Sequence, residues 1–232
     1  PFEYKEHPMY HSIGEIPALS EIQFSITSNR GCFGSCNFCA LTFHQGRIVQ
    51  GRSKQSMIEE AKKMTLMSDF KGYIHDVGGP TANFSKPPCK KSSEKGTCNN
   101  KYCLHPTPCK NLEVDHHEYM ETLKELRSLP KVKKVFIRSG IRYDYLLSDK
   151  NRKKILKDIC EHYVSGQLRV APEHISNNVL DYMGKPRKEV YEKFLEGFYK
   201  ESENLGKKQY VVPYFMSSHP GSSLEDAIEL AL

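Results

Sequence analysis

Three cysteines near the start of the chain have a spacing suited to binding an iron–sulfur cluster. Cys32, Cys36 and Cys39 form a C-x3-C-x2-C array that directly follows a β-like run at residues 22–27. Three thiolates on one tight loop can bind three iron atoms of a 4Fe-4S cube and leave the fourth iron without a protein ligand. The sequence therefore predicts a metal cluster with one open coordination site, at which a small molecule can bind.

Zinc and plain buried thiols are the alternatives for this loop. A structural zinc site normally has four protein ligands, and no fourth Cys or His stands at the usual spacing. His44 is the nearest candidate. We expect His44 to position the backbone or to contact substrate instead.

A second set of cysteines lies in an insertion at residues 85–112. Cys89, Cys98, Cys103 and Cys109 have the spacing C-x8-C-x4-C-x5-C, among lysines and glycines with almost no apolar residues. Such a segment cannot form a core of its own, so we expect a metal to order it, either zinc or a second iron–sulfur cluster. Two disulfides are the alternative, and His105 is a possible substitute ligand.

The elements that must position these cysteines follow a repeated order of strand and helix. Apolar periodicity and turn residues predict parallel βαβ units. We expect strands at 22–27, 71–77, 135–138, 167–171 and 210–216, and helices at 56–67, 118–129, 149–163 and 188–205, with a last helix after residue 222. Capping boxes are expected at Ser56-x-x-Glu59 and Ser222-x-x-Glu225, and Gly206 is expected to end the fourth helix. Cys160 falls in an apolar helix stripe, where we expect it to be a small buried side chain.

Unusual residues gather after each of the five expected strands. They are the cysteine loop, Gly78-Gly79-Pro80, Ser139-Gly140, Pro172-Glu173-His174 and His219-Pro220-Gly221. In (βα) barrels functional residues collect at the carboxyl ends of the strands. We therefore expect an α/β fold: a partial (βα) TIM-type barrel of five or six units at residues 21–232, preceded by a lead-in at 1–20, with the cysteine-rich insertion after strand two.

The fourth expected strand carries an unusual pair of charges. Period-2 alternation places Arg169, Ala171 and Glu173 on one face and Leu168 and Val170 on the other. Charges on an inward face are costly unless they are bound. Either they form a mutual salt bridge or they contact a ligand.

Taken together, several segments resemble the radical S-adenosylmethionine (SAM) superfamily, in particular its YgiQ-type branch. They are GCFGSCNFCALTFHQGRIVQGRS, DVGGPTANF, IRSGIRYD, RVAPEH and YVVPYFMSSHPG. The segment APEHISNNVLDYMGKPR is similar to methylthiotransferase-like members. Family members are longer on both sides, so the resemblance implies that this chain is a fragment containing the central radical SAM domain.

The resemblance implies a cofactor and a reaction. A 4Fe-4S cluster on the cysteine loop would cleave SAM reductively to a 5′-deoxyadenosyl radical, which abstracts hydrogen from an unidentified substrate. An electron donor such as a flavodoxin or ferredoxin would be a partner. The SAM contacts that it implies are Phe38, Gly78, Gly79, Pro80, Ser139, Arg169, Glu173, Lys185, Pro220 and Gly221, with Arg187 as the alternative to Lys185. Pro80 stands where the family has an acidic residue. The alternative for Gly78-Gly79 is an ordinary turn between a strand and a loop, with no role in SAM binding. Arg142 and Asp144 belong to the site or form a surface pair.

Composition narrows the class of protein. The chain has 232 residues and a net charge of +6, with its basic residues in short scattered clusters, which does not favour nucleic acid as a partner. It contains neither a long apolar run nor a signal-peptide pattern. Eight cysteines without secretory features indicate reduced thiols, and hence the cytoplasm. Two other functions stay open, a zinc-binding interaction module on a barrel scaffold and a SAM-binding sensor without turnover.

Overall fold

The computed structural model describes residue 16 and residues 18–232. Most of the lead-in expected at residues 1–20 therefore lies outside the described residues. Its last part enters α1, Leu19–Ile22.

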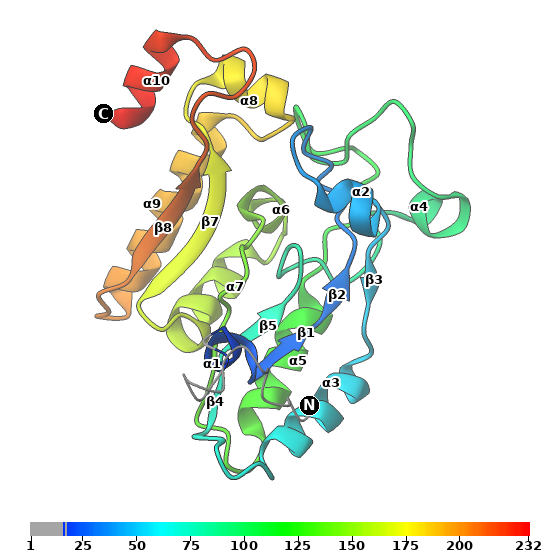
Figure 1. The fold of residues 1–232 in the computed structure, drawn as a ribbon, viewed down its shortest axis with the longest axis vertical. Helices are drawn as coiled ribbons and strands as arrows, with labels where there is room; N and C mark the ends of the chain where they lie inside the picture. The colour runs from blue at the N-terminus through cyan, green and yellow to red at the C-terminus, as the bar shows by residue number, and fades with distance from the viewer. Residues whose placement is uncertain (1–15, 17) are drawn as a thin grey trace.

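Three pairs of parallel strands form the framework of a mixed α/β fold. β1 (Ser25–Thr27) pairs with β5 (Asp76–Gly78), and β4 (Tyr73–Ile74) pairs with β6 (Lys134–Val135). The longest pair joins β7 (Gln167–Glu173) to β8 (Tyr210–Phe215). An antiparallel pair, β2 (Asn29–Arg30) with β3 (Gln50–Gly51), flanks the cysteine loop. Within the described residues these pairs do not close into a barrel, and Figure 1 shows β7–β8 standing apart from β1–β5.

Helices alternate with these strands, as the periodicity predicted. They are α2 (Leu41–Gln45), α3 (Lys54–Met64), α4 (Lys90–Lys95), α5 (His117–Ser128), α6 (Tyr143–Leu147), α7 (Arg152–Asp158), the π-helix η2 (Ile159–Tyr163), α8 (Asn177–Met183), α9 (Lys188–Asn204) and α10 (Leu224–Ala231). No described helix is long and apolar enough to span a membrane.

The main core lies between the strands and the helices that cover them. In β7, Leu168 and Val170 are fully buried, whereas Arg169 and Ala171 on the other face are half-buried. This alternation confirms the period-2 prediction, because successive side chains of a strand point to opposite faces. Cys160 is also fully buried in the core, as expected.

Several expected boundaries were wrong by a few residues. Ile22 ends α1 instead of beginning a strand, and the expected strand at 71–77 is interrupted at His75. The helix expected from Ser56 starts earlier, because the Ser53 side chain accepts the N–H of Ser56 as its cap. The last capping box is formed by Ser223 and Asp226, one residue later than predicted.

Several further elements were not expected. The segment after β6 forms α6, and the helix expected at 149–163 is α7 followed by a turn of π-helix. The insertion contains α4. Short helices of this kind lack the long apolar period on which sequence reasoning depends.

The loops that follow β2, β7 and β8 lie at one end of the molecule. In Figure 1 the arrows of β7 and β8 point toward the upper end, where α2, α4, α8 and α10 are found, while α3 and β4 lie at the lower end. The cysteine loop connects β2 to α2 and therefore lies at the same end of the molecule as α2.

Candidate functional site

The cysteine loop is held by backbone hydrogen bonds and by a tight glycine. The N–H of Cys32 donates to the carbonyl oxygen of Gly46 at 3.0 Å, and that of Cys39 donates to Cys36 at 3.1 Å. Gly31 has φ +80°, and a Cβ there would lie 2.0 Å from the carbonyl oxygen of Ile48. Only glycine fits this position, so the loop is closed at its start by the absence of a side chain.

The three thiols of the loop are close enough to affect one another without converging on one point. Cys32 is 9% exposed, while Cys36 and Cys39 are half-buried. Burial raises the pKa of Cys39, and the neighbouring Cys36 and Cys32 raise it further. Among the described residues, no three His, Cys, Asp or Glu side chains are arranged to hold a single metal ion. A cluster makes a different demand, since each cysteine binds a different iron atom.

A buried guanidinium contacts the loop. Arg142, only 6% exposed, donates from Nη1 to the Sγ of Cys36 at 3.2 Å and from Nε to the Oδ1 of Asp144 at 2.8 Å. Burial would lower the pKa of Arg142, but Asp144 and Cys36 raise it well above its ordinary value. Arg142 is therefore a fixed cation beside the thiols, and its pairing with Asp144 is not the surface pair that the sequence left open.

A chain of buried hydrogen bonds positions Arg142. The Asn83 side chain accepts the backbone N–H of Arg142 at 2.8 Å and donates to its carbonyl oxygen at 3.2 Å. The same amide lies 3.0 Å from Nε2 of His116, whose Nδ1 is 2.7 Å from Asp149. Donation by Asn83 assigns the hydrogen of His116 to Nδ1, so the imidazole donates to Asp149. Hydrogen bonds to Asp149 outweigh its burial and lower its pKa.

A second buried cation lies at the same end of the molecule. Lys185 is 3% exposed, and its ammonium donates to the carbonyl oxygen of Ala171. Burial lowers the pKa of Lys185, and Arg142 lowers it further, against the opposing effects of Cys36 and Glu173. Burial raises the pKa of Glu173, against the charges of Lys185 and Arg142. The start of α6, the end of β7 and the segment after α8 thus bring two cations and a carboxyl near one another, with Cys36 close to both cations.

Some polar atoms of this region have no hydrogen-bond partner among the described residues. They include Nη2 of Arg142, Oδ2 of Asp144 and Nδ2 of Asn29, all buried. Buried polar groups are normally paired, so unpaired ones need a reason. A ligand with acceptor atoms next to the guanidinium would satisfy Arg142, and the thiol-rich loop beside it fits a cluster with an open iron.

The glycine pair after β5 allows two other segments to approach closely. A Cβ on Gly78 would lie 2.7 Å from the Cβ of Ser139, and one on Gly79 would lie 2.6 Å from the carbonyl oxygen of Asn29. The carbonyl oxygen of Gly78 already accepts the N–H of Ser28 at 2.7 Å. Pro80 is half-buried.

Ser139 is held by a residue that the sequence did not single out. Its hydroxyl donates to Oδ2 of Asp76, and its N–H donates to Oδ1 at 2.9 Å. The N–H of Arg138 donates to the same oxygen at 2.7 Å. Asp76 therefore shapes the loop after β6, and the Ser139 hydroxyl already has a partner within the protein.

Phe38 and the turn after β8 meet at α8. Phe38 packs against the apolar cluster of α8 and lies edge-on to the ring of His219, with 6.1 Å between centroids. A Cβ on Gly221, which has φ +89°, would lie 2.7 Å from the Tyr182 ring. Pro220 and Gly221 themselves are exposed.

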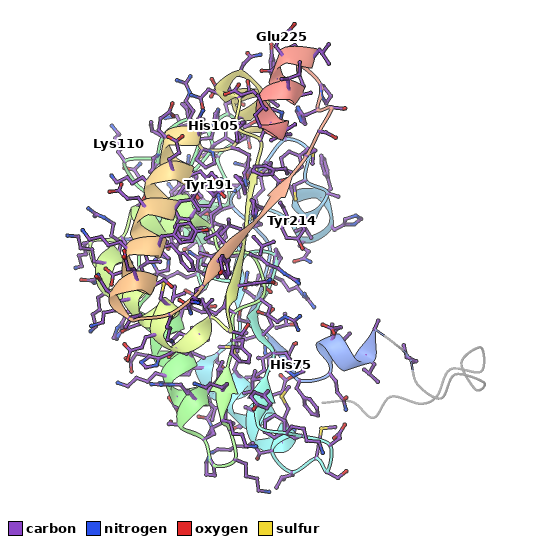
Figure 2. All side chains as sticks on the ribbon, turned by 90° about the vertical axis from the view of Figure 1, so that its left-hand side faces the viewer. His75, His105, Lys110, Tyr191, Tyr214 and Glu225 are labelled. Carbon is purple, nitrogen blue, oxygen red and sulfur yellow. The ribbon has the colours of Figure 1, made fainter. Side chains whose placement is uncertain are left out.

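One expected site residue, Arg169, lies away from the cysteine loop. Arg169 lines a pocket of about 190 Å³ together with His75 and Arg138, and no residue of the cysteine loop lines that pocket. Figure 2 shows His75 far below His105, whose Nδ1 lies 3.0 Å from the carbonyl oxygen of Lys185. No ion pair joins Arg169 to Glu173, so the mutual salt bridge is not formed.

The alternative to Lys185 does not reach the site. Arg187 is exposed and pairs with Asp181 at 2.7 Å. Of the two basic residues, Lys185 is therefore the one placed near the thiols.

The cysteine-rich insertion packs against the cysteine loop. Arg47 donates to Ser35 at 2.7 Å and to the carbonyl oxygens of Cys98 and Lys101 at 2.9 and 3.0 Å. The Tyr102 hydroxyl donates to Asn37 at 2.7 Å. These bonds join the two sets of cysteines.

The insertion contributes to an apolar cluster that is formed mostly by residues outside it. Leu104 is buried in an apolar cluster with Phe33, Phe84 and Tyr145, against which Cys103 and Leu112 pack. The few apolar residues of the insertion are therefore used to anchor it.

Sequence reasoning missed the residues that support Arg142. A buried Asn83, His116 and Asp149 have no short-range spacing in common, because they lie in three different segments. The only local signal was the position of Asn83 just after the glycine pair.

Comparison with known proteins gives close relatives but no activity. No family model matches the chain. It is 60% identical over 231 residues to a UPF0313 protein of Clostridium botulinum strain 657, covering the whole chain and 36% of that protein. A UPF0313 protein of Clostridium perfringens strain SM101 is 58% identical over 231 residues, and the chain covers 35% of it. The chain thus spans about a third of the length of the curated relatives it matches.

Proposed function

We propose that the chain contains the catalytic domain of a radical SAM enzyme of the YgiQ-type branch. The observation that carries the proposal is the cysteine loop with the buried Arg142 donating to Cys36 at 3.2 Å. A fixed cation beside three clustered thiols would offset the negative charge that a thiolate-bound cluster carries.

The residues around the loop have separable roles in this proposal. Cys32, Cys36 and Cys39 hold a 4Fe-4S cluster, and when bound the cluster supplies the electron for reductive cleavage of SAM. Arg142, with Nη2 unpaired, and the buried Lys185 provide positive charge where the carboxylate of SAM would bind. Phe38, beside His219, offers an apolar wall at the end of β8.

The strand ends support a shared site for these groups. Four non-glycine residues of the described chain have positive φ, and three of them lie at or after strand ends: Glu173 is the last residue of β7, while Ser35 and Ser218 lie in the loops after β2 and β8. Such backbone strain is found preferentially at functional sites. We take the three parallel pairs as the walls of a partial barrel, which the remaining length of the full protein would extend.

An experiment on SAM cleavage tests the proposal. The full-length protein is reconstituted anaerobically with iron and sulfide, reduced with dithionite and assayed for 5′-deoxyadenosine formed from SAM. We expect product from the wild type and none from Cys36→Ala. Cys160→Ala is the matched control, because Cys160 is a fully buried thiol of the main core.

The outcomes separate the proposal from its rivals. Product that persists in Cys36→Ala would refute the role of the loop. A bound cluster that binds SAM without product would favour a sensor. Zinc alone, with no iron on the Cys32 loop, would favour an interaction module.

A further inference from the structure

The four cysteines of the insertion face one cavity. Cys89, Cys98, Cys103 and Cys109 all line a pocket of about 380 Å³, together with Lys91, Lys101, Lys110 and Tyr102. None of the four is in a disulfide. Residues spread over twenty positions of the chain thus present four thiols to a single space.

The insertion has little regular structure to hold this arrangement. Its only regular element is α4, which has six residues, and it is tied to the rest of the chain by the buried Leu104 and by hydrogen bonds of its loops. The N–H of Cys109 donates to the carbonyl oxygen of Cys103 at 2.9 Å, so these two lining residues are held together by the backbone. A group that binds all four thiols would join the segments that form the cavity wall and would therefore stabilise the insertion.

The spread of the thiols favours a cluster over a single ion. A tetrahedral zinc site, with Zn–S distances of about 2.3 Å, requires its four sulfurs to converge within about 4 Å of one another. No three of the described His, Cys, Asp and Glu residues converge in this way. In a 4Fe-4S cluster each cysteine binds a different iron atom, and in a 2Fe-2S cluster only two cysteines share an iron, so the four sulfurs stand farther apart than around a single ion.

The charges around the cavity suit a negatively charged group. The ammonium of Lys91 donates to the Sγ of Cys98 at 3.3 Å, and Lys101 and Lys110 also line the cavity. Four thiolates give a cluster a net negative charge, which these lysines offset. Hydrogen bonds to the sulfurs and nearby charge are also the means by which proteins adjust cluster potential.

We infer that Cys89, Cys98, Cys103 and Cys109 hold a second iron–sulfur cluster, next to the loop of Cys32. The inference rests on the insertion alone and does not depend on the proposed SAM chemistry. Arg47 bonds to Ser35 in the loop and to Cys98 in the insertion, so the two metal sites share a common wall.

The test separates the two cysteine sets. In the full-length protein Cys32, Cys36 and Cys39 are replaced by Ala, and the variant is reconstituted anaerobically with iron and sulfide. Iron, zinc and acid-labile sulfide are then counted per chain, and sulfur-to-iron charge-transfer absorption is recorded. We expect about two to four iron atoms to be retained. Adding Cys98→Ser and Cys109→Ser should remove them.

A second comparison keeps the test informative if the variant with several cysteine substitutions does not fold. With the Cys32 loop intact, Cys98→Ser combined with Cys109→Ser should lower the iron content by about two to four atoms relative to the wild type. Cys160→Ala should lower it by none. Iron content unchanged by the serine substitutions, or zinc in place of iron in the insertion, would overturn the inference. A cluster that persists without the Cys32 loop, in protein inactive toward SAM, would support this inference even if the proposed function failed.

Discussion

The buried pair of Arg142 and Asp144 provides the sharpest test of the candidate site. We consider Arg142→Gln, which keeps much of the side-chain length and removes the charge. Asp144 is 4% exposed, and its Oδ2 has no partner among the described residues. Removing Arg142 would leave this carboxylate buried without its cation. Breaking a buried ion pair in this way costs about 3–5 kcal/mol.

A double-mutant cycle isolates the pair itself. Arg142→Gln and Asp144→Asn should each destabilise the protein, and the double variant should lose less than the sum, because neither charge is then left alone. Contacting residues of this kind show coupling energies of about 0.5–3 kcal/mol, and we expect the upper part of that range. The assay is urea unfolding of the metal-free, thiol-reduced protein, followed by circular dichroism.

The chain offers a matched control in a second Arg–Asp pair. Arg187 and Asp181 pair at 2.7 Å with side chains 54% and 38% exposed. Exposed pairs contribute little because water screens both charges, so Arg187→Gln should have a much smaller effect than Arg142→Gln. Equal effects of the two substitutions, or additive effects in the cycle, would refute a buried and coupled Arg142.

Two further predictions concern the supports of the site. Gly79→Ala places a Cβ 2.6 Å from the carbonyl oxygen of Asn29 and should cost about 1–3 kcal/mol by thermal unfolding. Gly140→Ala meets no atom within 4 Å and should stay within about 0.5 kcal/mol, so equal losses at the two glycines would contradict the close approach. Asp149→Asn weakens the hydrogen bond with His116 and should cost about 1.5–3 kcal/mol at neutral pH. Hydrogen bonds outweigh burial and lower the pKa of Asp149, so its contribution is complete above the unfolded pKa of about 3.9 and is lost as pH falls through the lower folded value. Urea unfolding at several pH values should show the difference between wild type and variant shrinking in acid, and a constant difference would mean that the charge contributes nothing.

Local patterns predicted much of the fold. Alternation in β7 correctly placed Leu168 and Val170 on the buried face. The helix stripe correctly buried Cys160, and α9 ends at Asn204, with Leu205 as its C-cap and Gly206, at φ +64°, directly after it. These features depend on neighbours within a few residues, so the sequence contains the necessary information.

Longer-range features could not be predicted in the same way. Arg142 and Asp144 are two residues apart, and nothing in that spacing distinguishes a surface pair from a buried one. Arg142 is held in its buried position by Asn83, which lies 59 residues earlier in the chain. The Asn83 side chain binds both the backbone N–H and the carbonyl oxygen of Arg142. Likewise, Arg169 lies on the predicted face of β7, yet it lines a pocket away from the cysteine loop.

The sequence by itself predicted the order of the main strands and helices and indicated a cysteine loop suited to a cluster, because periodicity and close spacing are local properties. Only the tertiary structure decided which charges meet the thiols. It selected Lys185 over Arg187, brought Arg142 to Cys36, and turned four distant cysteines toward one cavity. The physical reason is that burial and hydrogen bonding across separate segments set the position and charge of these groups, and neither is encoded in the spacing along the chain.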